Sequence, residues 1–337
     1  MKLVIPAAGE GSRMFYVTLG HHGKPKELVY MGGVPALIRT IKDALEAGIH
    51  DVVLVSSHRK TALVEMFTSL EKIQQAAECE RNPVKRDEKL KQVETLLEVG
   101  TKVNYTVVYQ NEPLGLGHAV LQARAVIGDE PFAVALPDDH FLYGGSSLKL
   151  LMDRHNQSGL SNLILWEVPW AQASSYGIAS GEKHGDVVSI AQLAEKPSNP
   201  SSNMAVIGRY LLNSSVMERL HYNFENKLTG KNGEYQLTDA LEYEMNHHGL
   251  EGVIYRGVRH DTGHPEGLIR ANNAFWMDQN PEMMPGIIEV LSQHCRFGGE
   301  VPAEAVEQFF KFFEAFSERM PDVAQAIVDR FNVSSKT

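Results

Sequence analysis

Residues 2–13 read KLVIPAAGEGSR, an apolar run that leads directly into a turn of small residues. The run Lys2–Pro6 has the composition of a buried strand. The residues that follow it are Ala7, Ala8, Gly9, Glu10 and Gly11. Small residues after a strand let backbone N–H groups approach phosphate oxygens closely. This stretch therefore predicts an anion-binding turn at the end of the first strand.

Apolar runs of the same kind recur along the chain, at Asp51–Ser56, Asn104–Tyr109, Phe132–Leu136 and Asn162–Val168. Helical patterns lie between or after them, at Val34–Gly48, Leu116–Val126 and Thr238–Met245. Thr238 is the expected N-cap of the last helix. Runs with little polar interruption suit a mainly parallel sheet with helices on both faces. The alternation of strands and helices predicts a doubly wound α/β domain.

The composition limits the classes of partner. The chain has 337 residues, of which 43% are hydrophobic, and its formal net charge is −10. This is ordinary globular composition, sufficient for one large core or two smaller ones. An acidic surface repels polyanions, so we expect no nucleic-acid partner. A small phosphate substrate remains compatible, because it needs only a local group of cations and backbone N–H groups.

The cysteines and the N-terminus bear on location. Cys79 and Cys295 are far apart and form no CxxC spacing, whereas a disulfide framework or a thiolate metal site needs more cysteines. The apolar run at the N-terminus is too short for a signal peptide, and no stretch approaches the length of a membrane span. The sequence thus predicts a cytoplasmic protein without membrane association.

Two segments depart from the alternation. Thr61–Val99 is helix-compatible apart from a break expected at Pro83, and its charged part, Glu78–Lys91, is typical of a solvated helical excursion. The tail after about residue 280 carries apolar residues at helical spacing, which indicate core or subunit packing. They are Val306, Phe309, Phe312, Phe313 and Phe316.

Fixed cations follow the first turn. Arg13 and the run Lys24-Pro25-Lys26-Glu27 could hold a triphosphate through charge-assisted hydrogen bonds. The glycines do not fit G-x-G-x-x-G, because residue 14 is Met, and no GK[ST] follows. Dinucleotide and Walker-type phosphate loops are therefore excluded. Surface lysines beside a tight turn are the alternative reading.

Two carboxylates are candidates for a metal site. Asp138 comes directly after a strongly apolar strand, where ligands of open α/β sheets sit, and could hold Mg²⁺ while phosphates and water complete the coordination. The alternative is an aspartate that caps the following turn. Asp261, in His260-Asp261-Thr262-Gly263, could complete the seat or be a turn residue. The neighbours Asp139 and His140 are expected to be a solvated turn pair.

Taken in order, these motifs resemble the nucleotidylyltransferases that activate hexose 1-phosphates, and most closely their bacterial UDP-glucose pyrophosphorylases. The family opening A-G-x-G-[ST]-R and P-K-E-L is matched by residues 8–13 and 25–28. Residues 110–119, which end in GLGHA, match the nucleobase segment, and Leu136-Pro137-Asp138 matches the first metal aspartate. Tyr176-Gly177, Glu195-Lys196-Pro197, Asn203, Gly208-Arg209-Tyr210, the segment 234–240 and Asp261 follow in the family's order.

The resemblance covers residues 1–275 and implies a Rossmann-like doubly wound mixed sheet, with a C-terminal helical extension over residues 276–337. It assigns roles to individual residues. The nucleotide-binding residues would be Ala7, Ala8, Gly9, Glu10, Gly11, Gln110 and Gly115. The catalytic residues would be Arg13, Lys26 and Lys196. The sugar-binding residues would be Gly177, Glu195 and Asn203, and the metal ligands for Mg²⁺ would be Asp138 and Asp261.

The implied reaction is attack by glucose 1-phosphate on the α-phosphorus of UTP, giving UDP-glucose and pyrophosphate in the presence of Mg²⁺. Catalysis would come from positioning and electrostatics, without a covalent nucleophile. A homo-oligomer, dimer or tetramer, is expected. Two alternatives stay open: the same chemistry with dTTP or another sugar 1-phosphate, and a nucleotide-sugar-binding regulator with weak catalysis. The latter is motivated by a departure from the family pattern, Phe15-Tyr16 and an insertion around residues 19–23 that contains His21-His22.

Overall fold

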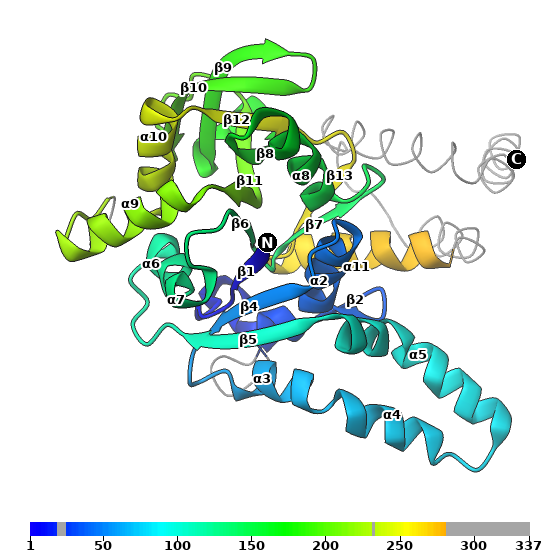
Figure 1. Ribbon diagram of the computed structural model, residues 1–337. Helices are drawn as coiled ribbons and strands as arrows, with labels where there is room; N and C mark the ends of the chain where they lie inside the picture. The colour runs from blue at the N-terminus through cyan, green and yellow to red at the C-terminus, as the bar shows by residue number, and fades with distance from the viewer. Residues whose placement is uncertain (19–24, 231–232, 281–337) are drawn as a thin grey trace, which may run out of the picture.

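The computed structural model describes residues 1–18, 25–230 and 233–280 (Figure 1). The insertion with His21-His22 and the apolar stripe of the tail lie outside the described residues. Within them, one nine-stranded sheet has the order β5-β4-β1-β6-β11-β8-β12-β10-β9. The strands are β1 (Lys2–Pro6), β4 (Asp51–Ser56), β5 (Asn104–Tyr109), β6 (Phe132–Ala135), β8 (Ser161–Glu167), β9 (Gly177–His184), β10 (Val187–Glu195), β11 (Met204–Leu212) and β12 (Leu250–Ile254).

The first half of the sheet is parallel. Strands β5, β4, β1 and β6 pair in one direction, so their carboxyl ends meet at one edge. The second half is largely antiparallel, and the expectation of a mainly parallel sheet is wrong there. The reason is local: Gly185 and Asp186 join β9 directly to β10, with a left-handed φ of 65° at Gly185. A two-residue turn makes a hairpin, whereas a parallel pair needs a crossover.

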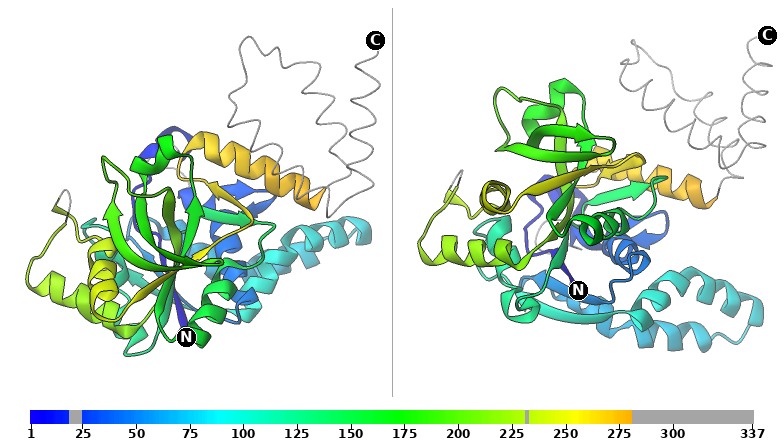
Figure 2. Two further views of the ribbon diagram at one scale, coloured as in Figure 1. Left: turned by 90° about the horizontal axis from the view of Figure 1, so that it is seen from above. Right: turned by 45° about the horizontal axis from the view of Figure 1, so that its top comes forward.

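Helices cover both faces of the sheet, as Figures 1 and 2 show. One face packs against α2 (Ala36–Glu46), α5 (Pro83–Lys102) and α8 (Ser147–Ser158), and the other against α6 (Leu116–Leu121), α7 (Arg124–Ile127), α9 (Ser214–Glu225) and α10 (Leu237–His247). Strand β1 shows why the strands read as continuous apolar runs: Leu3 and Ile5 enter one core and Val4 the other. The doubly wound, mixed-sheet prediction is confirmed.

The excursion between β4 and β5 is helical, as predicted. It comprises α3 (Thr61–Thr68), α4 (Leu70–Glu78) and α5, and the α4–α5 hairpin projects from the body in Figures 1 and 2. Pro83 opens α5, and the side chain of Asn82 caps it by accepting from the backbone N–H groups of Val84 and Lys85 at 3.0 and 3.2 Å. Most of the charged run Glu78–Lys91 is exposed, which confirms a solvated excursion.

Two smaller expectations need correction. The helix expected over Leu116–Val126 is divided into α6 and α7. Thr238 is not an N-cap: Gln236 occupies that position without a side-chain capping bond, and the Thr238 hydroxyl donates to Oε2 of Glu195 at 3.1 Å. The contact with Glu195 shows how a tertiary partner overrides the local capping signal of Thr238.

Two two-stranded ribbons lie outside the nine-stranded sheet, one of them beside the last described helix. The ribbon β2 (Tyr30–Met31)–β3 (Val34–Pro35) packs beside α11 (Pro265–Gln279), and β7 (Asp139–Leu142) pairs with β13 (Val258–Asp261). Helix α11 crosses the boundary predicted after residue 275, so the position of that boundary stays a prediction. No helix in residues 1–18, 25–230 or 233–280 is long and apolar enough to cross a membrane.

One ion pair makes the stability of the fold depend on pH. Arg154 on α8 donates from Nε and Nη2 to the carboxylate of Glu251 on β12, at 2.7 and 2.5 Å, and this bonding lowers the pKa of Glu251. A depressed folded-state pKa stabilises the fold above the unfolded value, about 4.3, and the stabilisation is lost as the pH falls through the folded pKa. We expect Glu251→Gln to lower the free energy of unfolding by about 1–3 kcal/mol at pH 7.

Urea denaturation at pH 7 and at pH 3 measures this effect, and the difference between wild type and variant should shrink at the lower pH. Asp153→Asn is the control. It removes an exposed i,i+4 partner of Lys149, and the free energy should change by less than about 0.5 kcal/mol. An equal loss at both pH values would show that packing, not the ionised carboxylate, stabilises this position.

Candidate active site

The predicted nucleotide and metal residues gather at the carboxyl edge of the parallel strands. Residues 7–11 follow β1, Gln110 follows β5, and Asp138 comes three residues after the end of β6. Strands β1 and β6 are neighbours, β4 alone separates β1 from β5, and all run parallel, so their loops converge at one edge of the sheet. The topology therefore accounts for the meeting of segments that are far apart in the sequence.

Lys26, Asp138, Asp261 and Arg13 form one cluster. Nζ of Lys26 lies 2.5 Å from Oδ2 of Asp138. A Cβ built on Gly263 would be 3.0 Å from Oδ1 of Asp261, 3.2 Å from Oδ2 of Asp138 and 3.4 Å from Nη2 of Arg13. The two carboxylates and Arg13 thus surround one point, and Lys26 joins the cluster through Asp138.

The predicted turn lies against the same cluster. Gly11 has a left-handed φ of 65°, and a Cβ there would be 3.3 Å from Cδ of Lys26. Arg13 belongs to the short 3-10 helix η1 (Ser12–Met14), which begins directly after Gly11. Glycine thus permits both the turn and the close approach of the lysine stem.

The opposite charges of Lys26 and Asp138 shift the pKa of each other. Burial would lower the pKa of Lys26, but the charges of Asp138 and Glu27 outweigh burial and raise it. Burial would raise the pKa of Asp138, but the charge and hydrogen bond of Lys26 outweigh burial and lower it. Both groups are therefore ionised at neutral pH, which is the state needed to bind phosphates and a cation.

The donor set fits Mg²⁺. Two carboxylates face the point beside Gly263, and carboxylate oxygens are ligands that this ion prefers. The described residues contain no group of three or more His, Cys, Asp or Glu side chains arranged as a metal cage. A site of this kind leaves most coordination positions to water and substrate phosphates, as is usual for Mg²⁺.

Asp139 and His140 are not a solvated turn pair, because they begin β7 and are 5% and 2% exposed. Asp139 accepts from Nε of Arg259 at 2.7 Å and from the backbone N–H of Gly208 at 2.9 Å. His140 faces His260 across the ribbon, and burial lowers the pKa of His140 well below its usual value and that of His260 to about 4. Both histidines are neutral at pH 7, and Asp139 has a structural partner.

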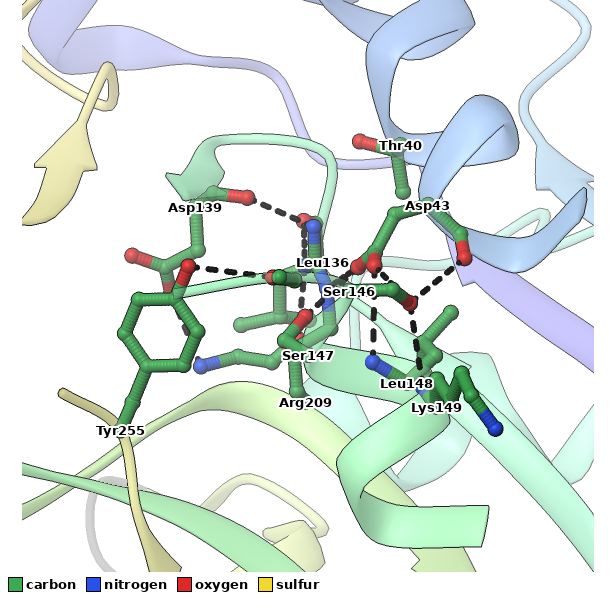
Figure 3. A network of polar contacts seen from close by, with 12 residues as sticks. Thr40, Asp43, Leu136, Asp139, Ser146, Ser147, Leu148, Lys149, Arg209 and Tyr255 are labelled. Atoms are coloured by element: carbon green, nitrogen blue, oxygen red, sulfur yellow. Dashed lines mark hydrogen bonds and ion pairs between the residues drawn. The ribbon is translucent and has the colours of Figure 1, made fainter. Parts of the chain in front are cut away.

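A buried arginine, which the sequence placed in a family motif without assigning it a role, holds the turn that carries Asp138 (Figure 3). Arg209 on β11 donates to the carbonyl oxygens of Leu136 and Asp139, each at 2.8 Å, and to Oδ2 of Asp43 at 3.1 Å. Asp43 also accepts from the hydroxyls of Ser146 and Ser147 at 2.6 Å. The guanidinium thus ties both ends of the turn to α2 and α8. Nothing local in the sequence indicates these partners.

Arg259 on β13 links the β7–β13 ribbon to the segment that carries the predicted sugar-binding residue Gly177. Its guanidinium pairs with Asp139, lies 3.5 Å from Oδ2 of Asp261, and donates to the hydroxyl of Tyr176 at 3.4 Å. Its position two residues before Asp261 is the only sequence signal for this role. Through Arg259, Tyr176 is linked to Asp139 and Asp261.

Gln110 and Gly115 come together as predicted. Nε2 of Gln110 donates to the carbonyl oxygen of Gly115 at 3.1 Å. Gly115 has a φ of 109°, and a Cβ there would be 2.7 Å from the carbonyl oxygen of Tyr235. The backbone N–H of Gly117 donates to that oxygen at 2.8 Å. The glycines are required because the GLGHA segment packs against the backbone of residues 234–236.

Gly177, Glu195 and Lys196 also come together. Gly177 pairs with Glu195 in the β9–β10 hairpin, and a Cβ on Gly177 would be 3.2 Å from Oε2 of Glu195. Lys196 follows at once, with a left-handed φ of 45° and its backbone N–H bonded to the carbonyl oxygen of Tyr176 at 3.1 Å. Such a backbone is uncommon for a residue other than glycine and is found at functional sites.

Asn203 is placed differently. Its Nδ2 donates to the carbonyl oxygen of Val168 at 3.0 Å, and its own carbonyl oxygen accepts from the N–H of Val168. In the described part of the chain, no hydrogen bond joins Asn203 to Gly177 or Glu195. Its sugar-binding role stays a prediction.

Comparisons with known proteins match the motifs. The family described as Nucleotidyl transferase matches residues 2–276. A UTP–glucose-1-phosphate uridylyltransferase of Pseudomonas aeruginosa is 32% identical over 277 residues, covering 81% of this chain and 94% of the relative. One of Bacillus subtilis is 34% identical over 294 residues, covering 86% and 94%.

Solved structures agree. A UDP-glucose pyrophosphorylase complexed with UDP-glucose has a TM-score of 0.71 and 30% identity, covering 82% of this chain and 98% of the neighbour. A UTP-bound UGPase from Acinetobacter baumannii has a TM-score of 0.72 and 28% identity, covering 86% and 99%. The resemblance and the fold predicted from the motifs are confirmed.

The Arg209 network predicts a large loss of stability. Arg209→Met should lower the free energy of unfolding by about 3–5 kcal/mol, because it removes a buried guanidinium that donates to Asp43 and to two carbonyl oxygens. The control is Arg59→Met, which breaks an exposed contact with Glu10 and should change stability by about 0–1 kcal/mol. Equal midpoints in thermal denaturation of the two variants would contradict the network's role.

Proposed function

The chain belongs to the nucleotidyl transferase family and is a nucleotidyltransferase, and from this premise we propose that it transfers the uridylyl group of UTP to glucose 1-phosphate. The products are UDP-glucose and pyrophosphate. The observation that carries the proposal is the cluster of Asp138, Asp261 and Arg13 around one point, with Lys26 bonded to Asp138 and packed on the turn at residues 7–11. Two cations and two carboxylates are the groups that a triphosphate with a divalent ion requires.

The nucleotide lies along the carboxyl edge in this proposal. Gln110 and Gly115 read the uracil edge, since a side-chain amide and a peptide group supply paired donors and acceptors. The turn at residues 7–11 follows the ribose and phosphates, and Arg13 binds the diphosphate that leaves. The support is the contact between Gln110 and Gly115, together with the lysine stem that packs on Gly11.

The sugar phosphate approaches from the β9–β10 hairpin. Glu195 accepts the sugar hydroxyls, Gly177 leaves room for the ring, and Lys196 pairs with the phosphate. A phosphate oxygen of glucose 1-phosphate then forms a bond with the α-phosphorus of UTP, and the bond from that phosphorus to the bridging oxygen breaks. The attacking phosphate is already ionised, so no general base is needed. The neutral, buried His140 and His260 agree with this.

The barrier is mainly the repulsion between two polyanions. Lys26 and Lys196 reduce this repulsion from opposite sides, and Arg13 stabilises the charge that collects on the departing pyrophosphate. Asp138 and Asp261 would hold Mg²⁺, which when bound neutralises phosphate charge and polarises the reacting phosphoryl group. The Lys26–Asp138 contact holds the lysine at the position where the α-phosphate is expected.

A coupled assay for pyrophosphate release tests the proposal. The wild type with UTP, glucose 1-phosphate and Mg²⁺ should turn over, and Asp138→Asn should lower kcat by about 10²–10³-fold, because half of the metal seat loses its charge. The control Asp153→Asn, on the exposed face of α8, should keep the wild-type rate.

A folded wild type that releases no pyrophosphate with this pair would overturn the proposal. Thermal stabilisation by UDP-glucose without turnover would then favour the regulator. The same assay compares UTP with dTTP, because thymine presents the hydrogen-bonding edge of uracil to Gln110. A higher kcat/KM for UTP supports the uridylyl assignment, and a higher value for dTTP favours a thymidylyltransferase.

A further inference from the structure

The ammonium group of Lys60 makes three contacts at the active edge. Lys60 precedes α3 in the loop after β4. Its Nζ lies 2.8 and 3.0 Å from the two carboxylate oxygens of Glu27 and 2.7 Å from the carbonyl oxygen of Ala7. An ammonium has three hydrogens to donate, so these acceptors account for all of them. Lys60 thus joins three segments that are distant in the sequence.

The carboxylate of Glu27 has little contact with solvent. Its side chain is 1% exposed, and that of Lys60 is 12% exposed. Glu27 lies in the short 3-10 helix η3 (Lys26–Leu28), directly after Lys26. An ionised carboxylate at such a position needs a cationic partner, because its desolvation is costly.

Two cations therefore lie within reach of Glu27, and only one is bonded to it. Lys60 binds Glu27, while Lys26 is directed at Asp138. The charge of Glu27 nevertheless acts on Lys26, where it is the second charge after Asp138 that raises the pKa. Lys26 would be the nearest replacement if Lys60 were lost. Because Lys60 already pairs with Glu27, Lys26 is left to bond Asp138.

We propose that Lys60 is a positioning residue: by neutralising Glu27 and holding the carbonyl of Ala7, it keeps Lys26 directed at Asp138 and the phosphates. The same contacts fix the anion-binding turn, which begins at Ala7, against the segment that carries Lys26. The inference rests on the proposed role of Lys26 in phosphate binding, but not on which nucleotide or sugar is used. Lys60 itself does not touch the substrate in this account.

The experiment compares Lys60→Met with the double variant Lys60→Met/Glu27→Gln, using the substrate pair that the wild type turns over. In the single variant the buried carboxylate draws Lys26 away from Asp138, and kcat should fall about 100-fold, as expected for a misplaced catalytic group. In the double variant the carboxylate is gone, Lys26 returns to Asp138, and kcat should recover to within about tenfold of the wild type.

The recovery separates positioning from direct binding. If Lys60 were itself a phosphate ligand, neutralising Glu27 could not replace its charge, and a double variant as slow as the single one would overturn the proposal. Lys149→Met, a lysine-to-methionine change on the exposed face of α8, is the matched control and should keep the wild-type rate. Assays are run well below each melting temperature, and circular dichroism checks the folded fraction.

Three further outcomes are decisive. If Lys60→Met does not fold, the double variant alone decides, since a rate near the wild type supports the proposal and a loss above about 100-fold contradicts it. A folded Lys60→Met with an unchanged kcat would show that the contacts serve stability only. A wild type that is inactive with UTP and glucose 1-phosphate but active with another pair counts against the proposed function and leaves this test intact.

Discussion

Charges of both signs lie paired, with little exposure to solvent, at the carboxyl edge of the sheet. Lys60 faces Glu27, and Lys26 faces Asp138. An unpaired charge there would be costly, so each group fixes the place of the next. The arrangement keeps the ammonium of Lys26 on Asp138, beside the proposed phosphate position, while Lys60 occupies Glu27. The sheet and its loops hold these charged groups in place.

The topology brings the groups together from distant parts of the chain. Parallel strands β1, β4 and β6 deliver the anion-binding turn, Lys60 and Asp138 to one edge. The ribbon β7–β13 then brings Asp261 beside Asp138, with the N–H of Thr262 donating to the carbonyl oxygen of Asp138 at 2.8 Å. Arg259 contacts Asp139 and Asp261 and also donates to Tyr176, which directly precedes the antiparallel strand β9. A phosphoryl transfer that depends on positioning needs this rigidity more than it needs an acid or a base.

The sequence predicted the strands of the parallel half well: β1 and β4 are buried on both faces and read as apolar runs, whereas the exposed edge strand β5 was recognised by its β-branched and aromatic residues. Strands β1, β4 and β5 have the predicted bounds. The order of the motifs also identified the family and most residues of the cluster. The roles of Arg209, Arg259 and Lys60 were missed, because the carboxylate that each one bonds most directly lies 33 to 166 residues away and no local pattern encodes such contacts. Asp139 and His140 were misjudged for the same reason, since their burial comes from a ribbon formed with a segment 120 residues later.

The central claim is that one divalent cation sits between Asp138 and Asp261 and faces the phosphates. Anomalous diffraction from a crystal grown with Mn²⁺ and UDP-glucose measures this directly. The account predicts a peak within coordination distance of both carboxylates and of the diphosphate, with Lys26 turned from Asp138 toward a phosphate oxygen. A bound nucleotide sugar with no peak there, or a peak bound by other residues while both carboxylates face away, would contradict it.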